Sequence, residues 1–79
     1  MKSNEYLKAL EADQSGNWNL AHNIVQDDSS SNGAWIHAYL HRKEGDQWNA
    51  EYWYRRAVKP VFKGTLEEEW AQLWSYFSE

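Results

Sequence analysis

Hydrophobic residues recur along this chain at intervals of three and four positions, and short polar stretches interrupt them. Such an interval places side chains on one face of an α-helix, whereas a β-strand alternates with a period of two. Two of the interruptions, Gly16-Asn17 and Gly45-Asp46, pair a glycine with a small polar residue. Glycine can end a helix in the left-handed conformation, and Asn or Asp can cap the next one. The pattern predicts an all-α fold of about five helices.

Residues 35–60 are the most informative stretch and are predicted to form two helices folded back on each other at Gly45. The second helix extends over about residues 47–59, and its predicted core face carries Ala50, Trp53, Tyr54, Ala57 and Val58. The opposite face combines two large aromatic residues with three cations: Trp48, Tyr52, Arg55, Arg56 and Lys59. This second set, the aromatic-cationic stripe, is not needed for the core.

An earlier hairpin is predicted from the same signals. Ser3 or Asn4 is expected to cap a helix that continues to about Ser15, and Asn17 to cap a helix with the inward residues Leu20, Ala21, Ile24 and Val25. The two turn glycines are 45 minus 16, or 29, residues apart. The polar residues 27–33 between the hairpins are expected to form a surface loop.

The hairpin around Gly45 resembles a tetratricopeptide repeat. Three positions after Gly45 carry the small and aromatic residues of that pattern: Ala50, Tyr54 and Ala57. Ala38 stands at the small position of the first helix, where it would let the two helix backbones approach closely. Three other positions depart from the pattern, which has Trp, Leu and Tyr there: Ala34, His37 and His41. The resemblance implies degenerate tetratricopeptide or Sel1-like antiparallel hairpins, and it covers roughly a third of the chain.

Three longer sequence motifs, at residues 35–42, 44–46 and 52–57, also resemble a set of small bacterial proteins to which no activity is assigned. The likeness extends back to Trp18, Ala21 and His22. It implies a bacterial origin and supports the helical-hairpin fold. It implies no function.

A fifth, amphipathic helix is predicted near the C-terminus. Thr65 and Glu68 have the spacing of a capping box, and the apolar residues that follow share one face: Leu66, Trp70, Leu73, Trp74 and Phe77. By analogy with solenoid proteins, we expect this helix to cap the open end of the last hairpin. The alternative is that it packs on the aromatic-cationic stripe, with the glutamates at 67–69 facing the cations.

The composition narrows the class of protein. At 79 residues the chain is expected to form one domain, residues 1–79. The absence of cysteine excludes disulfides, thiolate metal sites and cysteine nucleophiles, and no apolar run has the length of a membrane span or signal sequence. We therefore expect a cytoplasmic protein that has no membrane partner and requires no cofactor.

Three histidines form one candidate site. His37 and His41 are four residues apart, so they share a helical face on which two imidazoles can bind one metal ion. His22, from the preceding helix, is the candidate third ligand. Small-ligand or metal binding near these histidines and the aromatic residues of 47–59 is the second hypothesis for function. The alternative is that the histidines pack between helices and hydrogen-bond a carboxylate or a tyrosine.

The aromatic-cationic stripe is the main candidate for partner binding, because Trp, Tyr and Arg are enriched at interface hot spots. Its partner is expected to be another protein or a second copy of this chain. Single-stranded nucleic acid is disfavoured by the net charge of -4. The alternatives are burial beneath the fifth helix and a solvated face whose rings lie under their own arginines.

No catalytic motif accompanies these features. The chain has no glycine-rich phosphate loop and no nucleophile elbow, and so small a domain has little room for a substrate cavity. The sequence therefore predicts a non-catalytic protein-interaction or assembly module.

Overall fold

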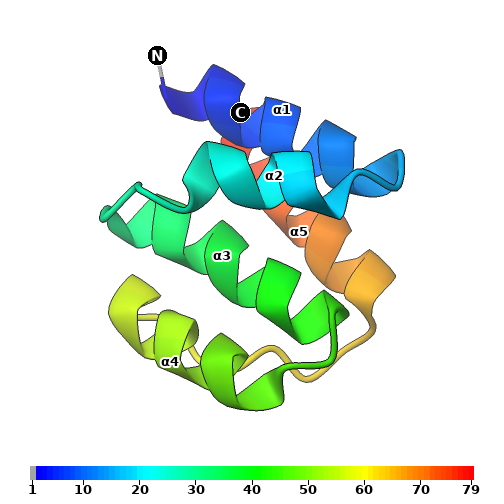
Figure 1. Ribbon diagram of the computed structural model, residues 1–79. Coiled ribbons are helices and arrows are strands. Elements are labelled where there is room, and N and C mark those ends of the chain that lie inside the picture. Colours follow the sequence, from blue (N-terminus) through cyan, green and yellow to red (C-terminus); the bar gives the residue numbers. More distant parts are fainter. Residues whose placement is uncertain (1) are drawn as a thin grey trace.

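The computed structural model describes residues 2–79, and every regular element among them is an α-helix (Figure 1). The helices are α1 (Lys2–Gln14), α2 (Trp18–Val25), α3 (Ser31–Lys43), α4 (Gln47–Ala57) and α5 (Leu66–Phe77). The prediction of an all-α fold with about five helices is confirmed.

The first four helices form two hairpins that pack side by side (Figure 1). α1 packs on α2 and α3 packs on α4, while the contact of α2 with α3 joins the hairpins. Ala38 and Ala50 are fully buried, as expected where two helices approach closely. Residues 33–40 of α3 are all buried, so α3 is surrounded on every side and forms the centre of the fold.

The two glycine turns form at the predicted positions, 29 residues apart in the sequence, and they have the same geometry. Gly16 and Gly45 take left-handed φ angles of 91° and 90°. Asn17 and Asp46 each accept a hydrogen bond of 3.2 Å from the backbone amide three residues further on. Each turn therefore ends one helix and caps the next within two residues.

Replacing Gly45 with alanine is expected to lower the free energy of unfolding by about 1–2 kcal/mol, because a left-handed backbone brings Cβ too close to the following carbonyl oxygen. An added Cβ at Gly45 meets no other atom within 4 Å, so the cost is confined to the backbone. Gly45→Asn is the matched control, since asparagine tolerates this conformation, and it should lose less. Urea unfolding of the three proteins measures both differences. An alanine variant as stable as the wild type would contradict this account of the turn.

α4 ends two residues earlier than predicted. The sequence pattern extends the helix to about Lys59, but Val58 takes the left-handed conformation, with φ 58° and ψ 45°. Pro60 disfavours a helical conformation in the residue before it, so the helix must finish here. Val58 is consequently 82% exposed, and its predicted place in the core is wrong.

Two helices begin earlier than predicted. Ser3 and Asn4 lie within α1, so neither of them caps it. α3 begins at Ser31, because the side chain of Ser30 caps it by accepting a hydrogen bond from the Gly33 amide at 3.2 Å. The last three residues of the predicted loop are therefore helical.

α5 lies across α1 and α3, one helix from each hairpin (Figure 1). Leu73 and Phe77 enter the core, and the Trp70 indole N–H donates to the Leu10 carbonyl at 2.9 Å. The backbone of α5 packs on α1 and α3 rather than on α4, and its link to α4 among the described residues is the hydrogen bond that the Tyr54 hydroxyl donates to Glu69. The helix therefore spans both hairpins instead of covering the end of the last one alone. The connector at 58–65 can span roughly 26 Å when extended, which is enough to carry α5 past α4.

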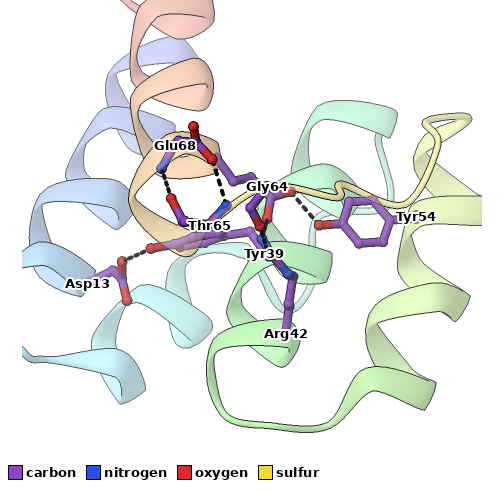
Figure 2. A network of polar contacts seen from close by, with 8 residues as sticks. Asp13, Tyr39, Arg42, Tyr54, Gly64, Thr65 and Glu68 are labelled. Carbon is purple, nitrogen blue, oxygen red and sulfur yellow. Dashed lines mark hydrogen bonds and ion pairs between the residues drawn. The ribbon is translucent and has the colours of Figure 1, made fainter.

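A buried carboxylate fastens α1 to α3. The Tyr39 hydroxyl donates to Asp13 at 2.7 Å, and Figure 2 shows this side chain directed at Asp13. The Lys43 ammonium lies 2.9 Å from the other oxygen of the same carboxylate. Asp13 is only 2% exposed, because it occupies the same helical face as the apolar residues of α1.

A second buried carboxylate fastens α5 to the second hairpin. Glu69 is fully buried and forms an ion pair of 2.8 Å with Arg42. It also accepts a hydrogen bond from the Tyr54 hydroxyl, and Arg42 donates to the Gly64 carbonyl, beside which Figure 2 shows it. The alternative in which this glutamate faces the cations of the aromatic-cationic stripe is therefore wrong. Glu69 lies within the apolar stripe of α5, which is the sequence signal for a buried, paired acid.

Candidate functional site

Four residues of the aromatic-cationic stripe share the outer face of α4: Trp48, Tyr52, Arg55 and Arg56. Trp48 is 80% exposed and Tyr52 is 40% exposed, and both arginines are exposed as well. Because α5 packs on α1 and α3, it does not cover this face. The outer face of α4 is therefore open to solvent within the described residues.

Arg56 is partly engaged by its own helix. It donates to the Tyr52 hydroxyl at 3.1 Å, and its guanidinium lies 5.9 Å from the centre of the Tyr52 ring and 5.2 Å from that of Trp53. A cation this close to a ring face is attracted to it by about 0.5–1 kcal/mol at an exposed site. Tyr52 and Arg56 thus match the alternative in which a ring lies under its own arginine, whereas Trp48 remains uncovered.

Lys59 lies apart from the other four residues. Its ammonium sits 4.4 Å from the centre of the Trp35 ring and 5.6 Å from that of Tyr76, on α3 and α5. The left-handed residue Val58 redirects the chain before Lys59. The cation at this position therefore contributes to packing between α3 and α5.

The histidines come together between α2 and α3. One ring nitrogen of each of His22, His37 and His41 lies within 4.8 Å of those of the other two. The Nε2 atoms of His22 and His37 are 3.1 Å apart. His37 and His41 stack with their ring centres 4.8 Å apart, one helical turn from each other. His37 is 4% exposed, and the other two rings are half-buried.

The surroundings of the cluster hold its rings in place. Trp18 stacks on His22 with ring centres 4.9 Å apart, and Trp53 stacks on His37 at 3.9 Å. Glu44 Oε1 lies 2.6 Å from His41 Nδ1. The predicted alternative, a histidine bonded to a carboxylate, is thus present at His41. The sequence interpretation did not pair Glu44 with His41, although Glu44, the C-cap residue of α3, follows His41 by three residues and this spacing was a usable signal.

Burial within the cluster favours the neutral form of His37 and of His22. Burial lowers the pKa of His37 from 6.5 to about 4, and the neighbouring His41 and His22 act in the same direction. Burial, followed by His41, also lowers the pKa of His22. A neutral imidazole carries one nitrogen with a free lone pair, which can accept a hydrogen bond or bind a metal ion.

Two surface hollows lie away from the histidines. One of about 250 Å³ is bordered by α1, α3 and α5, and it includes Tyr39 and Trp70. The other, of about 360 Å³, lies along the connector after α4 and includes Pro60 and Phe62. Neither is lined by His22, His37 or His41. The ring nitrogens of these three residues lie close enough to one another to act as ligands of one metal ion.

Comparisons of the chain with protein-family models, with curated proteins and with solved structures find no match. Of the helices in residues 2–79, none has the length and apolar character needed to cross a membrane. The outer face of α4 and the histidine cluster are therefore the features on which a function can be argued.

Proposed function

We propose that this protein is a non-catalytic interaction module that binds a partner protein through the outer face of α4. The observation that carries the proposal is Trp48, which is 80% exposed on a regular helix. Tyr52 and Arg55 follow it on the same face, and Trp, Tyr and Arg are the residues enriched at binding hot spots. Single exposed apolar residues are ordinary, but internal packing does not account for these three together.

A rigid support favours binding by this face. The inner side of α4 is fixed in the core by Ala50, Tyr54 and Ala57, all of which are buried. The Tyr54 hydroxyl is further held by Glu69 of α5. Since α4 is already ordered, a partner would pay little conformational entropy on the side of this protein.

The partner that fits this face is an acidic protein segment that carries an apolar side chain. Arg55 and Arg56 lie in the last turn of α4, and a guanidinium pairs with a carboxylate through two parallel hydrogen bonds. Trp48 offers a large ring for the apolar side chain. The molecule as a whole has a net charge of -4, so the attraction for an acidic segment is local to these arginines.

The double variant Trp48→Ala with Arg55→Ala tests the proposal. A displayed library of random linear peptides is selected on the wild-type protein, and the enriched peptides are titrated by fluorescence anisotropy. We expect acidic peptides with an apolar residue, and at least about 30-fold weaker binding to the double variant, because one hot-spot residue contributes about 2 kcal/mol or more. Affinity should also fall as salt is added, since part of the attraction is between charges.

Leu20, which was predicted to face inward, is 47% exposed on α2. Leu20→Ala with Lys8→Ala is therefore the matched control, because it removes one exposed apolar residue from α2 and one exposed basic residue from α1. It should bind the peptides as the wild type does. Equal binding by the Trp48/Arg55 double variant would overturn the proposal. A dimer seen in sedimentation velocity, and lost in that double variant, would instead assign this face to a second copy of the chain.

A further inference from the structure

We infer that His22, His37 and His41 form a binding site for one transition-metal ion of the Zn²⁺ type. Zinc binds imidazole nitrogens at about 2.0–2.1 Å in a tetrahedron, which places two ligand nitrogens about 3.3 Å apart. The Nε2 atoms of His22 and His37 are 3.1 Å apart, close to that spacing. The third ring nitrogen lies within 4.8 Å of both, so a small rotation of the His41 ring completes a three-nitrogen set.

Contacts within the protein leave this cluster incompletely paired. A neutral imidazole has one donor and one acceptor nitrogen. The contact between His22 and His37 uses one nitrogen of His37, and its Nδ1 atom has no hydrogen-bond partner among the described residues although the ring is only 4% exposed. Buried polar atoms are normally paired. An ion at Nε2 leaves Nδ1 as the protonated nitrogen, so the observation that points to an ion is the meeting of three ring nitrogens, and the unpaired Nδ1 atom shows that no protein group fixes the tautomer of His37 from that side. Three imidazoles gathered at this depth are not accounted for by apolar packing.

The neighbours of the cluster orient the nitrogens for coordination. Glu44 holds the Nδ1 atom of His41 at 2.6 Å, which directs the Nε2 lone pair of that ring away from the carboxylate. A carboxylate bound to the far nitrogen of a metal-ligating histidine is a recurring arrangement, and it raises the basicity of the ligand. The indoles of Trp18 and Trp53 stack on the other two rings and restrict their rotation. His22 and His37 are therefore already ordered before an ion binds, and only the His41 ring has to rotate.

The donor set selects the class of ion. Three imidazole nitrogens suit zinc, copper and nickel, whereas calcium and magnesium require oxygen ligands. His22 belongs to the first hairpin, and His37 and His41 belong to the second. An ion held by all three therefore links the two hairpins across the contact between α2 and α3, so its main effect is to stabilise the fold. The fourth coordination position is available to water.

A second group, His41 with Glu44 and Asp46, also has ligand atoms within 4.8 Å of one another, and variants separate it from the histidine cluster. His22→Gln removes a ligand of the cluster alone. Asp46→Asn removes a ligand of the second group alone and keeps the cap of α4, since asparagine caps as well as aspartate does. Circular dichroism establishes that both variants are folded.

Calorimetric titration of Zn²⁺ and of Mg²⁺ into the metal-stripped protein tests the inference, together with thermal unfolding of the same samples. We expect one Zn²⁺ per chain, no Mg²⁺ binding, and a melting temperature about 10 °C or more higher when free Zn²⁺ is 100 times the dissociation constant. His22→Gln should weaken binding at least tenfold, and Asp46→Asn should leave it unchanged. The inference would be overturned if Zn²⁺ produced neither a heat of binding nor a shift in melting temperature with the wild-type protein. It would also be overturned if Asp46→Asn lost zinc binding while His22→Gln kept it.

Discussion

Glu69→Ala is expected to lower the free energy of unfolding by about 3–5 kcal/mol, because removing one partner of a buried ion pair leaves the other uncompensated. Arg42 and the buried Tyr54 hydroxyl both lose the carboxylate that they share. Stabilities of small domains total about 5–15 kcal/mol, so the variant should be close to unfolding. Thermal unfolding should show a melting temperature at least about 12 °C lower.

Two variants separate the ion pair from other effects at this position. Glu67→Ala removes an exposed glutamate from the same first turn of α5, and it should cost only the about 0.3–1 kcal/mol of a charge near the helix N-terminus. Glu69→Gln keeps the shape and an acceptor for Tyr54, and it should lose less than the alanine variant. If Glu69→Ala and Glu67→Ala have the same stability, the buried pair does not hold α5 in place.

Acidification from pH 7 to pH 4.5 is expected to destabilise the metal-free protein by about 2–3 kcal/mol through His37. In the unfolded chain this imidazole takes up a proton as the pH falls through 6.5, whereas burial keeps it neutral in the folded protein down to a pKa of about 4. The unfolded state therefore binds more protons between these values, and the free energy of unfolding falls with the pH. Each pKa unit corresponds to about 1.36 kcal/mol.

The groups that face His37 act in the same direction as burial. His41 and His22 both disfavour a proton on His37. The lowered pKa of His22 further reduces the free energy of unfolding as the pH falls below 6.5. Urea unfolding at several pH values in the presence of a chelator measures the slope, and an NMR titration of the His37 ring gives its pKa directly. A titration midpoint near 6.5 would contradict the effect of burial on this ring.

Local signals in the sequence account for most of the secondary structure. The capping box forms as predicted, with the Glu68 amide donating to the Thr65 hydroxyl at 3.1 Å and the Thr65 amide donating to the Glu68 carboxylate at 2.8 Å. The turns at Gly16 and Gly45 likewise form at the expected positions. Each of these features depends on atoms within a few residues of one another, which is why the chain alone specifies them.

The candidate sites could be predicted only in part from the sequence. The spacing of His37 and His41 places them on one helical face, but the approach of His22 depends on how α2 packs on α3. The helical period is enough to predict which residues share the outer face of α4. Whether that face is covered depends on where α5 packs. The apolar stripe of α5 indicates that this helix packs on the rest of the protein, but it does not indicate on which helices.

The sequence by itself determined the approximate positions of the helices, the glycine turns and most of the residues that share each face, because these follow from backbone conformation and helical period. Only the tertiary structure decided where α5 docks, that Trp48 stays exposed, and that three histidines meet. The docking of α5 rests on Glu69 and Arg42, which lie 27 residues apart, and the histidine contact joins residues 15 apart. Contacts over such separations require the whole core to form, since no local signal compensates the entropy of closing the chain between them.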